Sequence, residues 1–347
     1  MPSTFRRLHR YRRTEKMRSL IKETSLAPTD LICPIVVQES LTERAAIESM
    51  PGIQLLPLSD VTKEVESISD MGIPSVMLFG IPTVKDNIGR SAFDKNGIVQ
   101  QAASQIKQTF GDRMVIMADV CLCQYTSTGH CGVISQGNVG AGSLHHVHDS
   151  DNDNRRFGTI DNDASLKLLT KIAVSQAESG VDVVSPSAMM DGQAVSIRSA
   201  LDESGFTDTM IMPHSAKHHS GFYSPFRGAT ECTPQFGDKA TYQVPYTNTR
   251  EAMLELESDV SEGVDIIMIK PALAYLDLVA EARRRFDLPV AAYNVSGEYA
   301  LVKAAATAGY VDGRQIALEI LYSIRRAGAD MIVTYFAKEV AGSLTET

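Results

Sequence analysis

The sequence predicts an α/β fold, a TIM (β/α)8 barrel with an extended N-terminal arm. Eight short apolar runs recur along the chain, the segments between them have helical periodicity, and a basic segment precedes the first run. With 347 residues, 44% of them hydrophobic, the chain is long enough for one large barrel. No linker separates two halves, so we expect residues 26–347 to form a single barrel.

The eight apolar runs are the expected barrel strands, because nearly continuous runs rich in Val, Ile and Met are typical of strands covered on both faces by helices. The runs are 31–37, 75–80, 114–120, 181–187, 209–215, 264–271, 288–295 and 331–337. A representative helix is expected over 161–180, where Asp161 or Asn162 can cap the N-terminus and Gly180 can end the helix. Its apolar face consists of Leu166, Leu169, Ile172 and Ala173.

The first 25 residues are expected to form a basic arm that makes subunit contacts. Residues 1–22 carry eight Lys and Arg residues against one acidic residue, whereas the remainder carries 25 basic and 41 acidic residues. An acidic body repels a phosphate backbone, and the arm has few aromatic residues for base stacking, so we expect no nucleic-acid partner. We expect the arm to dock on the acidic surface of a neighbouring subunit; a solvated tail is the alternative.

The composition indicates a cytoplasmic protein without a membrane partner. The apolar stretches are short and interrupted by charges, and the N-terminus lacks the apolar region of a secretory signal. Five cysteines in a chain of this length, three of them clustered, do not indicate a disulfide framework. In a reducing compartment they would remain thiols or act as thiolate ligands.

Two segments interrupt the strand and helix rhythm. Residues 134–159 are polar and Gly-rich and contain the sequence HHVHD, which indicates an inserted exposed loop. A flexible loop and a metal-binding tract are both open interpretations of it. Residues 218–245 form a long connection after the fifth run. Connections of this length are uncommon and often act as lids, so we expect an active-site lid here.

Polar residues lie at the ends of most predicted strands. TIM barrels place their chemistry at the C-terminal ends of the strands, so we expect these side chains to meet at one barrel mouth. They are Asp119, Ser187, Lys217, Lys270, Ser296 and Tyr335.

Lys270 and Lys217 are the candidate nucleophiles. Lys270 ends an apolar run, where poor solvation lowers the pKa of a lysine toward the neutral amine that attacks carbonyl groups. Lys217 is expected at a neighbouring strand end, and a second ammonium nearby would lower the pKa further. An ion pair with a barrel carboxylate is the structural alternative for Lys270.

The stretch DVCLCQYTSTGHCG, residues 119–132, contains a candidate metal site. Cys121, Cys123 and Cys131 provide three sulfur ligands suited to zinc, which leaves a fourth position open for water or substrate. A Lewis acid beside two lysines is a coherent catalytic arrangement. A closed site with His130 as fourth ligand and reduced cysteines without metal are the alternatives.

Five motifs, DVCLCQYTSTGHCG, SPSAMMDG, HSAKHHSGFYSPFR, MIKPALAYLD and YNVSGEYA, resemble those of one enzyme family. That family is porphobilinogen synthase, also called 5-aminolevulinate dehydratase, and the resemblance covers nearly the whole chain. It implies a hydro-lyase of tetrapyrrole (haem) biosynthesis. Such an enzyme condenses two molecules of 5-aminolevulinate asymmetrically to porphobilinogen with loss of two waters.

The resemblance implies a role for each candidate residue. Lys270 would form the Schiff base with the substrate that becomes the propionyl side, Lys217 would bind the second substrate in the same manner, and Asp119 would transfer protons. Zn2+ on the three cysteines would polarise the second substrate or activate a water. The implied substrate-binding residues are Arg227, Lys239 and Gln243 for one carboxylate, Ser296 and Tyr335 for the other, Tyr223 and Phe222 as lid aromatics that exclude water, and Ser187.

The resemblance also implies an allosteric Mg2+ site at Glu255 and a homo-octamer whose arms contact neighbouring barrels. Two departures concern the lid. Lys239 replaces a usual arginine and loses the bidentate fork for a carboxylate. Thr241 stands where some relatives have a cysteine for a second zinc, so we expect that site to be absent.

A third departure concerns the surroundings of Lys217, where His214, His218 and His219 replace an aromatic and small residues. These histidines favour one alternative function, a catalytically weakened relative that binds zinc or a tetrapyrrole precursor. A class I aldolase or related lyase is the alternative within the enzymes. It would explain one lysine but neither the second lysine nor the three cysteines.

Overall fold

Nine parallel strands surround one apolar core in the computed structural model, which describes residues 6–135 and 159–344. The strands pair in the order β10-β11-β12-β13-β1-β4-β5-β8-β9. They are β1 (Leu31–Gln38), β4 (Ser75–Ile81), β5 (Val115–Val120), β8 (Val183–Pro186), β9 (Met210–Ile211), β10 (Ala216–Lys217), β11 (Ile267–Lys270), β12 (Val290–Asn294) and β13 (Met331–Thr334). Each predicted run contains at least one of them, and the (β/α)8 prediction is confirmed.

The barrel closes through its fifth strand, which consists of β9 and β10. On one side, Met212 and His214 donate backbone hydrogen bonds to carbonyls of β8. On the other side, β10 pairs in parallel with β11, and Lys217 lies in register with Lys270. Pro213 has no N–H to donate, which accounts for the interruption between the two short strands.

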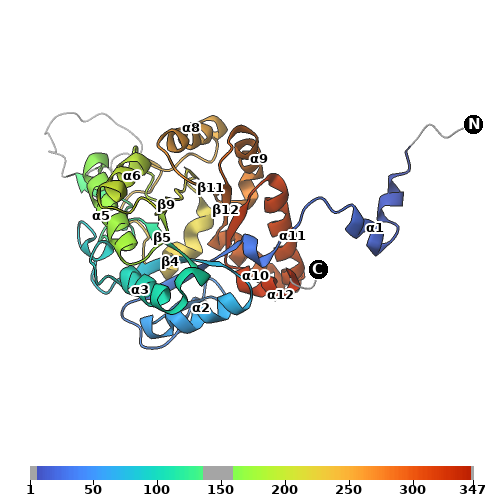
Figure 1. Cartoon of the computed structure of the whole chain (residues 1–347), viewed down its shortest axis with the longest axis horizontal. Coiled ribbons are helices and arrows are strands. Elements are labelled where there is room, and N and C mark those ends of the chain that lie inside the picture. Colours follow the sequence, from blue (N-terminus) through green and yellow to red (C-terminus); the bar gives the residue numbers. More distant parts are fainter. Residues whose placement is uncertain (1–5, 136–158, 345–347) are drawn as a thin grey trace, which may run out of the picture.

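Eleven helices are described, and those that follow the barrel strands cover the outside of the barrel (Figure 1). Their apolar faces pack on the sheet because the strands present apolar side chains outward as well as inward. The helices are α1 (Glu15–Leu20), α2 (Val61–Asp70), α3 (Ile98–Phe110), α5 (Asn162–Glu178), α6 (Gln193–Glu203), α7 (Ser224–Ala229), α8 (Thr249–Ser261), α9 (Leu276–Arg285), α10 (Ser296–Thr307), α11 (Gly313–Ala327) and α12 (Ala337–Leu344).

Helix α5 confirms the helix expected over 161–180. The carboxylate of Asp161 accepts a hydrogen bond from the Ala164 N–H at 2.9 Å and is the N-cap. Gly180 lies just beyond the end of the helix, at a φ of +90° that favours glycine. The buried face also includes Leu168, which the sequence pattern did not single out, whereas Leu166 is only half-buried.

Strand eight ends earlier than expected. The run 331–337 was predicted as one strand, but β13 stops at Thr334, and α12 begins at Ala337. The hydroxyl of Thr334 accepts a hydrogen bond from the Phe336 N–H at 3.2 Å, which turns the chain toward the helix. Tyr335 therefore follows the strand instead of lying within it.

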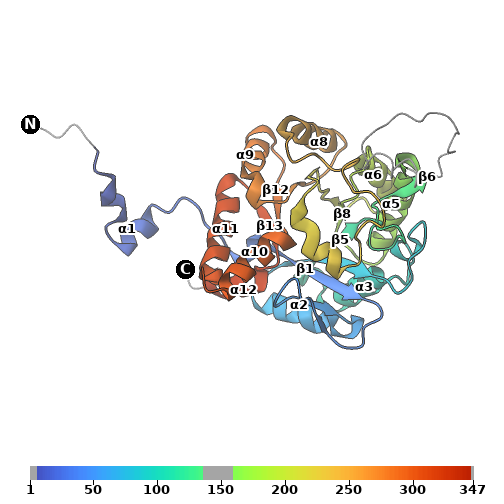
Figure 2. The same cartoon turned by 180° about the vertical axis from the view of Figure 1, so that it is seen from behind.

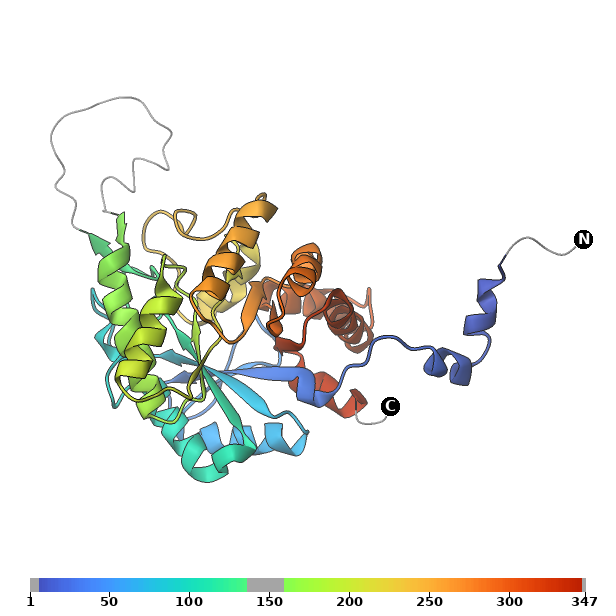
Figure 3. The ribbon, with the colours of Figure 1, turned by 45° about the horizontal axis from the view of Figure 1, so that its top comes forward.

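The N-terminal segment projects away from the barrel in each view (Figures 1, 2 and 3). It contains a 3-10 helix over Leu8–Arg12 and then α1, and neither has a buried residue. Exposed apolar side chains on this segment include Leu8, Tyr11 and Leu20, the last 78% exposed.

Most of the loop expected over 134–159 lies outside the described residues. Its two ends form an antiparallel ladder between β6 (Val133–Ser135) and β7 (Thr159–Asp161). Two further short strands, β2 (Ala45–Ala46) and β3 (Gln54–Leu56), extend the sheet beside β1. Within the described ranges, no helix combines the length and apolar character needed to cross a membrane.

Candidate active site

One cavity lies at the C-terminal ends of the barrel strands and collects most of the residues singled out in the sequence. It is enclosed by strand ends and by residues of the connection after β10. The expected residues that line it are Asp119, Cys123, Ser187, Lys217, Tyr223, Arg227, Lys239, Gln243, Lys270, Ser296 and Tyr335. Phe222, Glu255, Cys121 and Cys131 do not line it and are described below.

Lys217 and Lys270 lie side by side because β10 and β11 pair in register at these two residues. The Nζ of Lys217 donates a hydrogen bond to the Ser187 carbonyl at 2.5 Å. The Nζ of Lys270 lies 4.0 Å from the centroid of the Tyr293 ring. The two amines therefore have different surroundings within one cavity, a carbonyl for one and an aromatic face for the other.

Burial, and then the neighbouring charge of Lys217, lower the pKa of Lys270 to about 7, while Asp119 opposes this effect. A large fraction of Lys270 is thus the neutral amine near neutral pH. The neutral amine is the form that attacks a ketone. The structural alternative, an ion pair with a barrel carboxylate, does not hold Lys270 in its charged form here.

Asp119, the last but one residue of β5, is buried between both lysines and the metal loop. Its Oδ2 accepts a hydrogen bond from the Gln124 amide at 3.3 Å. Burial raises the pKa of Asp119, although Lys217, Ser187 and Lys270 counteract it. The Oδ1 atom has no hydrogen-bond partner among the described residues. The carboxyl group is therefore placed to exchange a proton with a group bound in the cavity.

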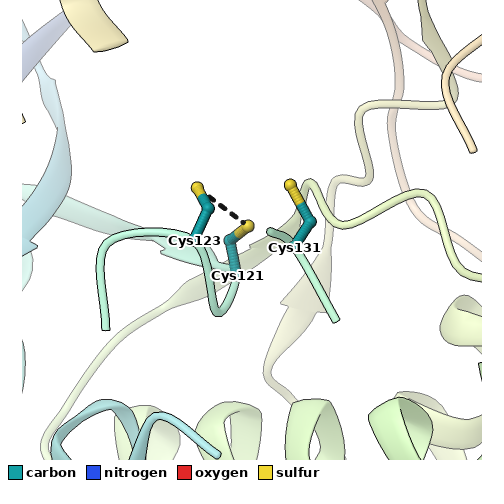
Figure 4. Close-up of side chains that lie close together, drawn as sticks. All are labelled: Cys121, Cys123 and Cys131. Carbon is teal, nitrogen blue, oxygen red and sulfur yellow. Dashed lines mark hydrogen bonds between the residues drawn. The ribbon is translucent and has the colours of Figure 1, made fainter. Parts of the chain in front are cut away.

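The three clustered cysteines bring their sulfur atoms together (Figure 4). The Sγ atoms of Cys121, Cys123 and Cys131 all lie within 4.8 Å of one another, and those of Cys121 and Cys123 are 3.4 Å apart. Hydrogen bonds from Cys121 and then Cys131 lower the pKa of Cys123. The surroundings therefore favour the thiolate form of Cys123.

These residues fit a metal ion. Tetrahedral Zn–S bonds of about 2.3 Å place sulfur atoms about 3.8 Å apart, close to the spacing of the cluster. His130 is not a fourth ligand in this structure, because both ring nitrogens are engaged: Nδ1 lies 3.0 Å from the Tyr242 hydroxyl and Nε2 lies 3.0 Å from the Phe236 carbonyl. The cluster thus offers three sulfur ligands that could hold a metal at the edge of the cavity.

Lys239 reaches the sulfur cluster from the lid. Its buried Nζ donates a hydrogen bond to the Sγ of Cys131 at 3.4 Å. Burial alone would lower the pKa of Lys239, but the charges of Cys123, Cys131 and the other cysteines outweigh it and hold the pKa above its ordinary value. The family resemblance implied that Lys239 binds a carboxylate of the substrate. In the structure, Lys239 also contacts a sulfur atom of the metal loop.

Cys232 lies beside these cysteines in the fold, although it is about a hundred residues away from them in the sequence. It is 2% exposed and lines the cavity with Cys123. A hydrogen bond with the Cys123 thiol lowers the pKa of Cys232 to about 6. The signal in the sequence was its position inside the segment predicted to be the lid.

The connection 218–245, the segment predicted to be the lid, contributes several residues to the lining of the cavity. It contains a 3-10 turn over Gly221–Tyr223, then α7, then irregular chain. The guanidinium of Arg227 lies 5.3 Å from the Tyr223 ring centroid. Buried Nη2 of Arg227 and Oε1 of Gln243 have no hydrogen-bond partner among the described residues. A buried polar group without a partner is costly, so both atoms are suited to a bound polar ligand.

Phe222 and Ser296 join the lid to the barrel. The hydroxyl of Ser296 donates to the Phe222 carbonyl at 3.3 Å and accepts from the Phe226 N–H at 3.2 Å. Phe222 contributes a backbone carbonyl to this contact, and its side chain lines a neighbouring surface pocket. Ser296 begins α10, as expected for a residue after the seventh strand.

Tyr335 and Tyr293 form the floor beside Lys270. Their hydroxyl oxygens are 3.2 Å apart, and burial raises the pKa of each phenol. Both remain neutral hydrogen-bonding groups at physiological pH. Tyr293 was not singled out from the sequence, because an aromatic residue inside an apolar strand is typical of core packing.

The three histidines near Lys217 have separate environments. His214 is fully buried, and burial, then Lys270 and Lys217, hold its pKa well below the usual value. His218 stacks on Tyr275, with ring centroids 3.9 Å apart. His219 pairs through its backbone N–H with Val244. None of these histidines belongs to the group of candidate metal ligands in the described structure.

Glu255 lies apart from the catalytic cavity, on α8. It lines a second cavity with other acidic residues, among them Asp191, Glu251 and Glu262. Burial and then these neighbouring charges raise the pKa of Glu255. The concentration of carboxylates is compatible with a divalent cation.

Comparison with known proteins gives one consistent family. A model described as delta-aminolevulinic acid dehydratase matches residues 5–343. The enzyme of that name from Archaeoglobus fulgidus is 49% identical over 338 residues, which cover 97% of this chain and 98% of the relative. The one from Synechococcus elongatus is 47% identical over 335 residues, which cover 96% and 97%.

A solved structure gives the same answer. The delta-aminolevulinic acid dehydratase (porphobilinogen synthase) of Toxoplasma gondii, in complex with the reaction product porphobilinogen, superposes with a TM-score of 0.91 at 39% identity. The match covers 99% of this chain and 93% of that one. The chain therefore belongs to the delta-aminolevulinic acid dehydratase family of lyases, and the fold, enzyme class and reaction that the motifs predicted are confirmed.

Proposed function

We propose that the cavity condenses two molecules of 5-aminolevulinate, with Lys270 and Lys217 each forming a Schiff base with one ketone. The observation that carries the proposal is the pair of lysines in register, one of them with a pKa of about 7. In each step the neutral amine adds to the carbonyl carbon, and the oxygen leaves as water. Lys270 takes the substrate that becomes the propionyl side, and Lys217 takes the other.

The other residues bind and transfer protons. Arg227, Lys239 and Gln243 face one carboxylate from the lid, and Ser296 with Tyr335 faces the other from the strand ends. Asp119 accepts and returns protons, since it lines the cavity with both lysines and its Oδ1 has no hydrogen-bond partner among the described residues. Ser187 positions Lys217 through its carbonyl. Tyr223 and the backbone of Phe222 limit the access of water that would hydrolyse the imines.

We assign Zn2+ to Cys121, Cys123 and Cys131. Sulfur ligands favour zinc over magnesium, and the cluster provides three of them. Bound there, zinc would act as a Lewis acid toward the second substrate or a water. The five cysteines are free thiols in the structure, which supports a cytoplasmic, reducing location.

Two further assignments complete the proposal. Glu255 and its acidic neighbours take an allosteric Mg2+, and the exposed arm contacts a neighbouring barrel in a homo-octamer. The acidic cavity beside α8 and the exposed apolar residues of the arm support them.

The test of the Schiff bases uses the full chain. Incubation with 5-aminolevulinate alone should give porphobilinogen. Incubation with 5-aminolevulinate and borohydride should give a covalent adduct on the Lys270 peptide. The variant Lys270→Met should lose the adduct and the product, whereas Lys95→Met, at an exposed lysine, should retain both. An active enzyme without any adduct on Lys270 would contradict the proposal.

Removal of metal tests the zinc assignment. Dialysis against a chelator should abolish product formation, and Zn2+ should restore it. Full activity at a residual metal content far below one ion per chain would show that the cysteines have no catalytic role.

A further inference from the structure

Cys232 remains without a function in the proposal above. It lies in the lid, three residues beyond the end of α7, and its side chain is almost completely buried. It lines the same cavity as Cys123 and is within hydrogen-bonding reach of that thiol. A fourth sulfur atom is thus present at the edge of the three-cysteine cluster.

The end of α7 holds this sulfur atom in position. The N–H of Cys232 donates to the Arg227 carbonyl at 3.1 Å. The Sγ of Cys232 lies 3.1 Å from the Thr230 hydroxyl, which donates to the Phe226 carbonyl at 2.8 Å. Hydrogen bonds of this kind orient a ligand atom and are typical of the surroundings of metal-binding residues.

The local charge also suits a fourth thiolate. Zinc with three thiolates carries one net negative charge, and a fourth thiolate makes it two. The buried ammonium of Lys239 lies 3.4 Å from the Cys131 sulfur and attracts both Cys131 and Cys232. The ammonium of Lys239 offsets part of the added negative charge. This matters because an uncompensated buried charge is costly.

We propose that Cys232 is a fourth sulfur ligand of the metal ion held by Cys121, Cys123 and Cys131, and that it is displaced when the second substrate binds. The inference rests on the zinc site of the proposed function. Cys232 approaches the cluster at Cys123, so ligation requires the loop after α7 to move toward the metal. In that step the thiol gives its proton to solvent as the S–Zn bond forms, with no change of oxidation state. Incoming substrate then replaces the sulfur, so the lid and the metal are joined only in the substrate-free enzyme.

X-ray absorption of the zinc-loaded enzyme tests the ligand count. We expect four sulfur neighbours in the parent, three in Cys232→Ser, and three in the parent after addition of 5-aminolevulinate. Cys33→Ser is the matched control, since Cys33 is also buried but lies on β1 outside the metal group, and it should retain four. The variant Cys232→Ala serves if the serine variant binds metal through its hydroxyl.

Competition with a chromogenic chelator gives an independent readout. Loss of the fourth ligand should weaken zinc binding by about 10- to 100-fold or more in both Cys232 variants, but not in the control. Three sulfur neighbours in the parent, with an unchanged affinity in the variants, would overturn the inference and leave the three-cysteine site intact. Four sulfur neighbours that persist with substrate would overturn the displacement. Failure of the parent to bind zinc at all would refute the zinc assignment itself.

Discussion

The chemistry of Lys270 is determined by its immediate surroundings. Burial against the Tyr293 ring, followed by the charge of Lys217, lowers the pKa of Lys270, and Asp119 opposes this shift. Neutral amine accumulates above that pKa and ammonium below it. The reactivity of Lys270 toward a ketone should therefore depend on pH near neutrality.

The first prediction is that the rate of imine trapping on Lys270 rises as the pH increases through about 7. The measurement is the initial rate of borohydride-trapped adduct across a pH series, because trapping reports on the nucleophile and not on later steps. A rate that is constant between pH 6 and pH 8 would refute the assignment of Lys270 as the titrating group.

Two substitutions should move the pH at which the trapping rate is half-maximal, the midpoint, in opposite directions. Lys217→Gln removes a positive charge and should shift the midpoint to higher pH, whereas Asp119→Asn removes a negative charge and should shift it to lower pH. The same trapping assay gives both midpoints. Shifts in the same direction would show that packing, and not charge, controls the amine. In steady-state turnover, Asp119→Asn should cost about 100-fold or more in kcat if it transfers protons.

At the scale of the elements, the lid is fitted against the first turn of α10. A Cβ on Gly297 would lie 2.5 Å from the Phe222 carbonyl oxygen and 2.7 Å from its Cα, and backbone atoms cannot yield as a flexible side chain does. Glycine is thus required for the close approach of the lid to the helix.

Gly297→Ala should displace the lid and lower kcat/KM by up to about 100-fold, because a misplacement of about 1 Å can have that effect. Steady-state kinetics and thermal unfolding together test this prediction. Gly228→Ala, within α7 and with open space around the added methyl group, is the control and should leave kcat/KM close to the parent value. Equal effects of the two substitutions would argue against a steric cause.

The elements also show which features could be predicted from the sequence. Apolar runs located all eight strands, and the strand-end rule collected both lysines, Asp119 and Tyr335 at one mouth, because parallel strands bring distant residues to the same edge. The division of the fifth strand at Pro213 could be recognised only once the neighbouring strands that pair with it were known. The position of Cys232 near the other cysteines could be recognised only from the path of the lid, because sequence spacing groups cysteines only within one loop.

At the scale of the whole molecule, the basic arm and the acidic body carry opposite charges, and neither described helix of the arm has a buried residue. We expect it to bind a neighbouring barrel through both charge and apolar contacts. Deletion of residues 1–22 should convert the parent oligomer to smaller species in sedimentation velocity. High salt should weaken the parent assembly in part, because salt screens exposed charges but not apolar burial. An assembly that is unchanged by the deletion would contradict the role of the arm.

The acidic cavity at α8 predicts a response to magnesium. Glu255→Gln should abolish or strongly reduce any stimulation by Mg2+, because the ion would lose a carboxylate ligand in a cavity where negative charges repel one another. Titration of activity with Mg2+ measures it. Glu319→Gln, at an exposed position on α11, should keep the parent response.

The closure of the barrel through a divided strand has a consequence for local opening. The seam between β8 and β11 is bridged by β9 and β10, which pair with these strands at only two positions each, and Lys217 is the last residue of β10. Amide hydrogens over 210–217 should exchange with solvent faster than those of β1 and β4, which share seven paired positions. One of the two reactive amines is thus attached to the stretch of barrel wall that should open most often, and ligand binding there should slow its exchange.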